Sequence, residues 1–67
     1  MVNTKKLKGV LVEHGFSQQS LAKEMNLSKN TLNSRINGRS EFSTEEVKTI
    51  CRLLYLSQEQ MLDIFFT

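Results

Sequence analysis

The segment SQQSLAKEMNLSKNTLNSRING, residues 17–38, decides the fold of this chain. It predicts two short helices that meet at a tight corner formed by residues 26–28. The small Ala22 indicates where the two helices would cross, because a close approach there tolerates only a small side chain. Asn26 can adopt the left-handed conformation that such a corner requires. In the second helix, Leu32 and Ile36 are four residues apart and form one apolar face.

A local pattern recurs at five places along the chain, two of them within this segment. An apolar residue precedes a small polar residue, and a second apolar residue follows four positions after the polar one, as in a hydrophobic staple around an N-cap. The predicted caps are Asn3, Ser17, Ser28, Ser43 and Ser57. Two of them, Ser43 with Glu46 and Ser57 with Gln60, also have the spacing of a capping box.

The predicted helices span roughly residues 4–14, 17–25, 28–36, 43–55 and 57–65. Each has apolar residues at helical spacing; in the fourth they are Val47, Ile50, Cys51 and Leu54. No segment alternates apolar and polar residues as a strand does. We therefore expect an all-α fold, a compact bundle of about five short helices, in a single domain covering residues 1–67.

The composition limits the class of protein. The chain has 67 residues, 39% of them hydrophobic, which suits a small globular domain. No apolar run approaches the roughly 18–20 residues needed to cross a bilayer, so no membrane partner is expected. The lone Cys51 cannot form an internal disulfide, which fits a reducing compartment. These features predict a small, soluble, cytoplasmic protein.

Charge is distributed unevenly along the chain. Residues 1–40 contain seven Lys and Arg against two Glu, a net charge of +5. Residues 41–67 contain two basic against five acidic residues, a net charge of −3. The basic half carries the two-helix segment. This asymmetry fits a molecule with one side facing a polyanion, although ordinary solvated surface charge gives the same pattern.

Two helices joined by such a corner have the layout of a helix-turn-helix, in which the second helix enters a DNA groove. The polar residues of that second helix suit base edges, because Asn pairs with adenine, Lys with guanine and a Thr methyl with thymine. The candidate base-contacting residues are Lys29, Asn30, Thr31, Asn33 and Ser34. The candidate phosphate contacts are Gln18, Arg35, Asn37, Arg39 and Ser40.

Residues 18–38 resemble the helix-turn-helix of the Cro and phage-repressor (XRE-type) family. The shared features are Gln18, Ala22 four residues later, Leu-Ser after the turn, an apolar residue in the middle of the second helix, and Asn37-Gly38. The resemblance implies a lambda-repressor-like bundle, base contacts led by Lys29 and Asn30, and backbone contacts from Gln18, Asn37 and Arg39.

Arg35 departs from the family pattern, because many members carry an apolar residue at this position. Two explanations are open. The helix is rotated slightly so that Ile36 takes the inner place, or the Arg35 side chain extends along the surface toward a phosphate.

The last predicted helix ends in the apolar stretch Met61-Leu62-Asp63-Ile64-Phe65-Phe66. Some of these residues must pack on the body of the bundle, and the others can form a surface for a protein partner. Leu62 and Phe65 are the candidates for the core. Met61, Phe65 and Phe66 are the candidates for the partner surface, so Phe65 belongs to both sets.

Catalytic and metal sites are not indicated. His14 has no Cys or carboxylate at ligand spacing and is predicted to end a helix, while Cys51 is predicted to pack in the core. The capping serines have no general base near them in the pattern. We expect no enzyme activity, no cofactor, no metal and no small-molecule substrate.

The sequence is compatible with two functions. The first is a sequence-specific transcription regulator of the phage Cro or repressor type, which occupies a double-stranded DNA operator in a bacterial host, as a monomer or a homodimer. The second is an antirepressor, a modulator of repression that forms a heterodimer with a phage repressor and blocks its DNA binding. Glu41 beside the polar loop and the apolar tail leave room for the second.

Overall fold

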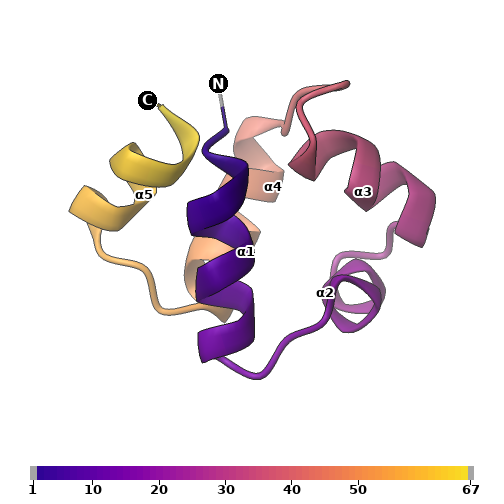
Figure 1. The fold of residues 1–67 in the computed structure, drawn as a ribbon, viewed down its shortest axis with the longest axis horizontal. Coiled ribbons are helices and arrows are strands. Elements are labelled where there is room, and N and C mark those ends of the chain that lie inside the picture. The colour runs from indigo at the N-terminus through magenta and orange to yellow at the C-terminus, as the bar shows by residue number, and fades with distance from the viewer. Residues whose placement is uncertain (1, 67) are drawn as a thin grey trace.

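A polar side chain caps each of the five helices that the computed structural model contains within residues 2–66, the part of the chain it describes. The helices are α1 (Thr4–Glu13), α2 (Gln18–Glu24), α3 (Lys29–Ile36), α4 (Thr44–Leu53) and α5 (Gln58–Phe65) (Figure 1). All five predicted caps accept a hydrogen bond from the backbone N–H three residues on, namely Asn3, Ser17, Ser28, Ser43 and Ser57. No strand occurs between residues 2 and 66, and the all-α prediction is confirmed.

The capping boxes at Ser43 and Ser57 are also confirmed, since Glu46 and Gln60 each accept from the backbone N–H of the cap at 2.9 Å. A third box was not predicted. Ser20 accepts from the Ser17 N–H at 2.9 Å and completes a box at the start of α2. Serine is absent from the usual capping-box pattern at this position, so the sequence signal is weak.

The end of α4 differs from the prediction, which carried this helix to residue 55. The helix ends at Leu53, Leu54 is the C-cap, and Tyr55 has a φ of 51°. This left-handed residue lets Leu56 N–H donate to the Cys51 carbonyl at 3.0 Å, which satisfies one of the carbonyls at the helix end. A tyrosine gives no sequence signal for a left-handed turn, unlike glycine or asparagine.

Replacing Tyr55 by glycine should stabilise the protein. The Tyr55 side chain is 87% exposed, so little packing is lost. A left-handed L-residue costs about 1–2 kcal/mol, and the greater unfolded-state freedom of glycine offsets part of this, so the free energy of unfolding should rise by about 0.5–1 kcal/mol. Urea denaturation measures it. Tyr55→Ala is the control, because it keeps the Cβ that causes the strain. A lower stability of Tyr55→Gly than of Tyr55→Ala would contradict this account.

One apolar core joins all five helices. Its fully buried members include Leu7 of α1, Leu21 of α2, Leu32 and Ile36 of α3, Ile50 and Leu54 at α4, and Ile64 of α5. Cys51 packs against this core, as predicted, and its partial burial raises the pKa of its thiol. His14 is the C-cap of α1, as predicted.

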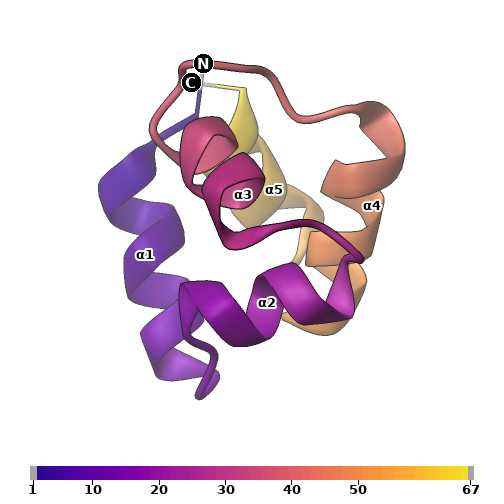
Figure 2. The ribbon, with the colours of Figure 1, turned by 90° about the vertical axis from the view of Figure 1, so that its right-hand side faces the viewer.

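The start of α1 is tied to two other helix ends. The Thr4 hydroxyl donates to the carbonyl of Ile36 at 2.7 Å, and the Asn3 N–H donates to the carbonyl of Ile64 at 2.6 Å. Figures 1 and 2 show the beginning of α1 beside the end of α5, with the end of α3 close by. These bonds satisfy carbonyls that a helix C-terminus leaves free.

The apolar residues of α5 pack only partly as predicted. Ile64 and Phe65 are the buried residues, at 2% and 5% exposure, and the Phe65 ring makes an edge-on contact with Phe42. Phe65 is therefore mainly a core residue, as one of its two predicted roles had it, although it also lines the apolar groove beside Phe42. The core assignment of Leu62 is wrong, because this side chain is 49% exposed. The helical phase explains both, since Met61, Ile64 and Phe65 share one face and Leu62 lies about 100° away from Met61.

No helix within residues 2–66 combines the length and the apolar character that crossing a membrane would require.

Candidate nucleic-acid interface

The corner between α2 and α3 has the geometry that its residue types predict. Asn26 has a φ of 56°, in the left-handed region. Ala22 is 2% exposed at the crossing of the two helices, and its carbonyl accepts from the Leu27 N–H at 2.9 Å. Figure 2 views α3 from its outer side, with α2 below it and α1 and α4 on either side. The corner therefore holds α3 on the outside of the bundle.

Burial on one side of α3 determines which residues are available on the other. Leu32 and Ile36 are fully buried and hold the helix on the core. Lys29 and Asn30, in the first turn, are exposed. Neither side chain makes a hydrogen bond or an ion pair within the described part of the chain. Their donors and acceptors are thus unengaged at the N-terminal end of the helix, the end that contacts bases in a helix-turn-helix.

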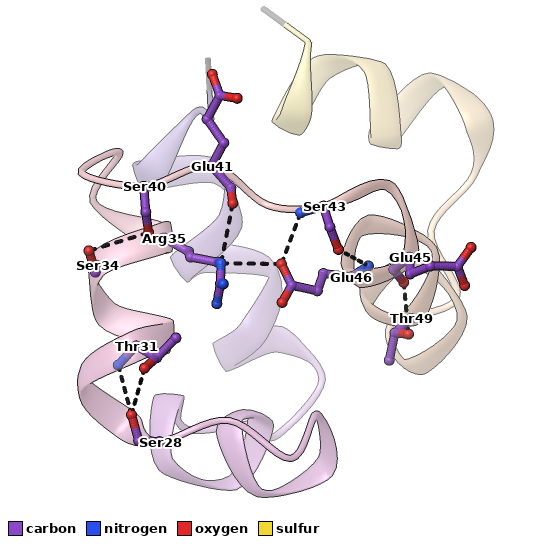
Figure 3. A network of polar contacts seen from close by, with 10 residues as sticks. All are labelled: Ser28, Thr31, Ser34, Arg35, Ser40, Glu41, Ser43, Glu45, Glu46 and Thr49. Carbon is purple, nitrogen blue, oxygen red and sulfur yellow. Dashed lines mark hydrogen bonds and ion pairs between the residues drawn. The ribbon is translucent and has the colours of Figure 1, made fainter.

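Thr31 lies in the same turn but is tied to the cap. Ser28 Oγ accepts from the Thr31 N–H at 3.0 Å and donates to Thr31 Oγ1 at 2.8 Å (Figure 3). The threonine hydroxyl therefore helps to close the start of α3. Its methyl group is the part that remains for a contact with a base.

Asn33 is engaged on both sides by other members of the predicted site. Its Nδ2 donates to Gln18 Oε1 at 3.3 Å, and its Oδ1 accepts from Asn37 Nδ2. A bidentate contact with adenine would need both of these atoms. The geometry places Asn33 as a brace between the start of α2 and the end of α3. Because Asn33 holds Gln18 Oε1, the orientation of the Gln18 amide nitrogen is fixed as well.

The loop after α3 folds back onto the helix end. Gly38 has a φ of 80°, and its N–H donates to the Arg35 carbonyl at 3.2 Å. The Arg39 N–H donates to the Ser34 carbonyl at 2.9 Å, and Ser40 Oγ donates to Ser34 Oγ at 3.4 Å. The backbone donors of this loop are therefore used internally. The exposed side chains of Asn37 and Arg39 are the donors that the loop offers to phosphates, whereas the Ser40 hydroxyl proton is used in its bond to Ser34.

Arg35 is directed inward, toward α4. Its Nε lies 3.2 Å from Glu46 Oε1 and also donates to the backbone carbonyl of Glu41 at 3.2 Å (Figure 3). The side chain is 22% exposed, and its Nη1 is buried. The prediction of Arg35 as a phosphate contact is not supported by this placement. The inner place of Ile36 and the ion pair with Glu46 together account for an arginine at this position.

The sequence did not predict that Glu46 pairs with Arg35. Its spacing from Ser43 predicted the capping box, whereas its pairing with Arg35, eleven residues earlier, has no periodic signal. The only available hint was a charged residue at a place where the resemblance expects an apolar one.

Comparison with known proteins adds the family. The family model described as helix-turn-helix, of the Cro and XRE type, matches residues 7–57, which include α2, α3 and α4 entirely. No curated protein matches the chain. The matched region covers most of the 67 residues and contains the corner and the α3 surface described above. This chain belongs to the XRE family of helix-turn-helix proteins and is a DNA-binding transcription regulator of that type.

Proposed function

We propose that this regulator binds a specific operator by placing α3 in the major groove, and that it acts by occupying that site in a phage or prophage switch. The observation that carries the proposal is the exposed, unengaged pair Lys29 and Asn30 at the start of a helix anchored by Leu32 and Ile36. Bidentate and charged side chains at this end of the helix are suited to base edges.

The other proposed DNA contacts fall into two groups, contacts with bases and contacts with phosphates. The Thr31 methyl and the Ser34 hydroxyl add to the base-contacting surface, and Asn33 orients Gln18 from behind. Gln18, Asn37 and Arg39 contact phosphates, where they set the register of α3 without distinguishing bases. Arg39 contributes a full positive charge, so its effect should depend on salt.

Two copies would bind the two halves of a symmetric operator, about 34–36 Å apart. Two exposed apolar residues are suited to join them, since Leu62 of α5 is 49% exposed and Phe66, the C-cap of that helix, is 64% exposed. Met61 is half-buried and borders this surface from the core side.

Selection from random-sequence duplexes tests the proposal directly. The full chain is incubated with the pool, bound duplexes are recovered and sequenced, and Kd is then measured for the enriched duplex and a scrambled one at two salt concentrations. A specific regulator enriches one site and binds it at least about 10³-fold more tightly than the scrambled duplex. Enrichment of no site would contradict the proposal.

One observation favours a second function, in which the chain binds a repressor protein. An apolar groove of about 680 Å³ lies between the start of α1, the α3–α4 loop, α4 and the end of α5. Phe42, Met61 and Phe66 line it, together with Asn37 and Gly38 of the loop. An apolar helix of a phage repressor seated there would abut the residues proposed to contact phosphates.

Co-expression with the repressor of the neighbouring gene separates the two functions. A stable heterodimer that no longer binds the operator, together with weak DNA binding by this chain alone, would favour the antirepressor. A steep fall of the chain's own DNA affinity with salt, at an enriched site, would favour the operator-binding regulator.

A further inference from the structure

The contact between Arg35 and Glu46 has features of a positioning device. Arg35 belongs to the last turn of α3, the helix that carries Lys29 and Asn30, and Glu46 to the first turn of α4. Both side chains are largely buried, with 22% and 20% exposure, and Nε and Oε1 are 3.2 Å apart. The pair is therefore shielded from solvent far more than a surface ion pair such as Lys6 with Asp63, where the exposures are 53% and 60%.

Glu46 Oε1 has two partners at once. It accepts from the Ser43 N–H at 2.9 Å and faces Arg35 Nε at 3.2 Å. The same Arg35 nitrogen donates to the carbonyl of Glu41. These contacts join the end of α3, the loop that follows it and the N-cap of α4 in one network (Figure 3). The end of α3 and the loop that follows it are thus linked to α4 through the same atoms.

The charge of Arg35 is already compensated by this network. If the side chain turned outward to a phosphate, the largely buried Glu46 carboxylate would lose its cation, and the Glu41 carbonyl would lose its donor. Removing one partner of a buried pair is unfavourable because the other charge stays desolvated. Arg35 Nη1 is buried as well, so the guanidinium lies inside the protein surface.

Base contacts are sensitive to the position of α3 in a way that phosphate attraction is not. A hydrogen bond to a base edge needs a donor–acceptor distance of about 2.7–3.2 Å. The attraction between a lysine and the DNA backbone extends over about 8–10 Å at moderate salt. A small tilt of α3 therefore weakens specific binding more than non-specific binding.

We propose that Arg35 and Glu46 are a positioning pair that sets α3 against α4, so that operator specificity depends on both residues although neither contacts DNA. This inference rests on the proposed function, because it concerns specific base contacts by α3.

Three variants test the pair on the duplex enriched by selection and on its scrambled counterpart. Arg35→Met keeps the length of the side chain and removes the charge. Glu46→Gln removes the charge and keeps an oxygen for the capping box, for which Gln is also suitable. Glu45→Gln is the matched control, since it makes the same change one residue away at an exposed side chain with no ion pair in the described residues.

We expect Arg35→Met and Glu46→Gln each to lower the ratio of specific to non-specific affinity by roughly tenfold, while Glu45→Gln leaves it unchanged. The slope of log Kd against log salt should stay the same in Arg35→Met. The double variant should lose about as much as either single one, because the two residues act as a unit.

The opposite pattern would overturn the proposal. If Arg35 contacts a phosphate, Arg35→Met weakens both duplexes equally and lowers the salt slope by about 1, and Glu46→Gln releases the arginine and tightens binding. Circular dichroism verifies folding of each variant. Should Arg35→Met not fold, Arg35→Lys replaces it: lysine keeps the charge for a phosphate but lacks the planar fork, so a positioning role predicts lost specificity and a phosphate role predicts retained binding.

Failure of the pair is distinguishable from failure of the proposed function. Selection that enriches no duplex would contradict operator binding itself. An enriched duplex that Arg35→Met and Glu46→Gln bind with the parental specificity ratio would contradict only the positioning pair.

Discussion

Replacing Lys29 and Asn30 together by alanine should weaken binding to the enriched duplex by about 2–4 kcal/mol, roughly a factor of 30 to 900 in Kd. Each side chain is exposed at the start of α3 and can make a base contact worth about 1–3 kcal/mol. Neither is part of the core, and both positions tolerate alanine in a helix. The circular dichroism spectrum and the unfolding midpoint should therefore stay close to those of the parent protein.

Arg39→Ala is the matched comparison for this double variant. Arg39 is exposed in the loop after α3 and is proposed to contact a phosphate. Its removal should weaken the enriched and scrambled duplexes alike and lower the salt slope by about 1. Equal losses on both duplexes for the Lys29 and Asn30 double variant would show that these residues supply charge only, and that the bases are recognised elsewhere.

Leu32→Ala should lower the free energy of unfolding by about 2–5 kcal/mol. Leu32 is fully buried and holds the middle of α3 on the core. A domain of this size has only a few kcal/mol in total, so much of the protein would be unfolded at 25 °C. Urea denaturation followed by circular dichroism measures the loss.

Leu62→Ala provides the same chemical change on an exposed side chain. Leu62 is 49% exposed on α5, so its truncation should cost well under about 1 kcal/mol. Operator duplex added in excess should raise the unfolding midpoint of Leu32→Ala, because it binds only the folded state. Similar losses for the two leucines would contradict the placement of α3 and α5 described above.

The features that sequence alone determined are local ones. Each cap joins a serine or asparagine to the backbone three residues later, so Ser28 and Ser43 could be assigned without knowing the fold. The left-handed Asn26 and the small Ala22 followed from the same short-range reasoning. The apolar spacing of Leu32 and Ile36 then indicated which side of α3 is buried, and hence that Lys29 and Asn30 are exposed.

Periodicity was less informative where many apolar residues adjoin. In residues 61–66, several rotations of the helix about its axis would each bury a plausible set of apolar side chains. Only the packing of α5 on the rest of the bundle selects Ile64 and Phe65 over Leu62. The contact of Phe65 with Phe42, residues 23 positions apart, contributes to that choice. The end of α4 at Leu53 was hidden for a different reason, because the residue type of Tyr55, in the turn that follows, opposes the left-handed conformation that it adopts.

The roles of the polar residues around α3 were decided by tertiary structure. Nothing in the local sequence distinguishes Asn33, which braces Gln18, from Asn30, which is unengaged. From the sequence alone, the Arg35 side chain could equally extend to solvent. In the folded protein, α4 places Glu46 Oε1 3.2 Å from Arg35 Nε. Caps and helical faces depend on residues three or four positions apart, which the chain itself keeps close. Side-chain partners eleven or fifteen residues apart meet only when the helices pack, so the sequence determined where α3 begins and which side it exposes, and the packed bundle determined how that side is held.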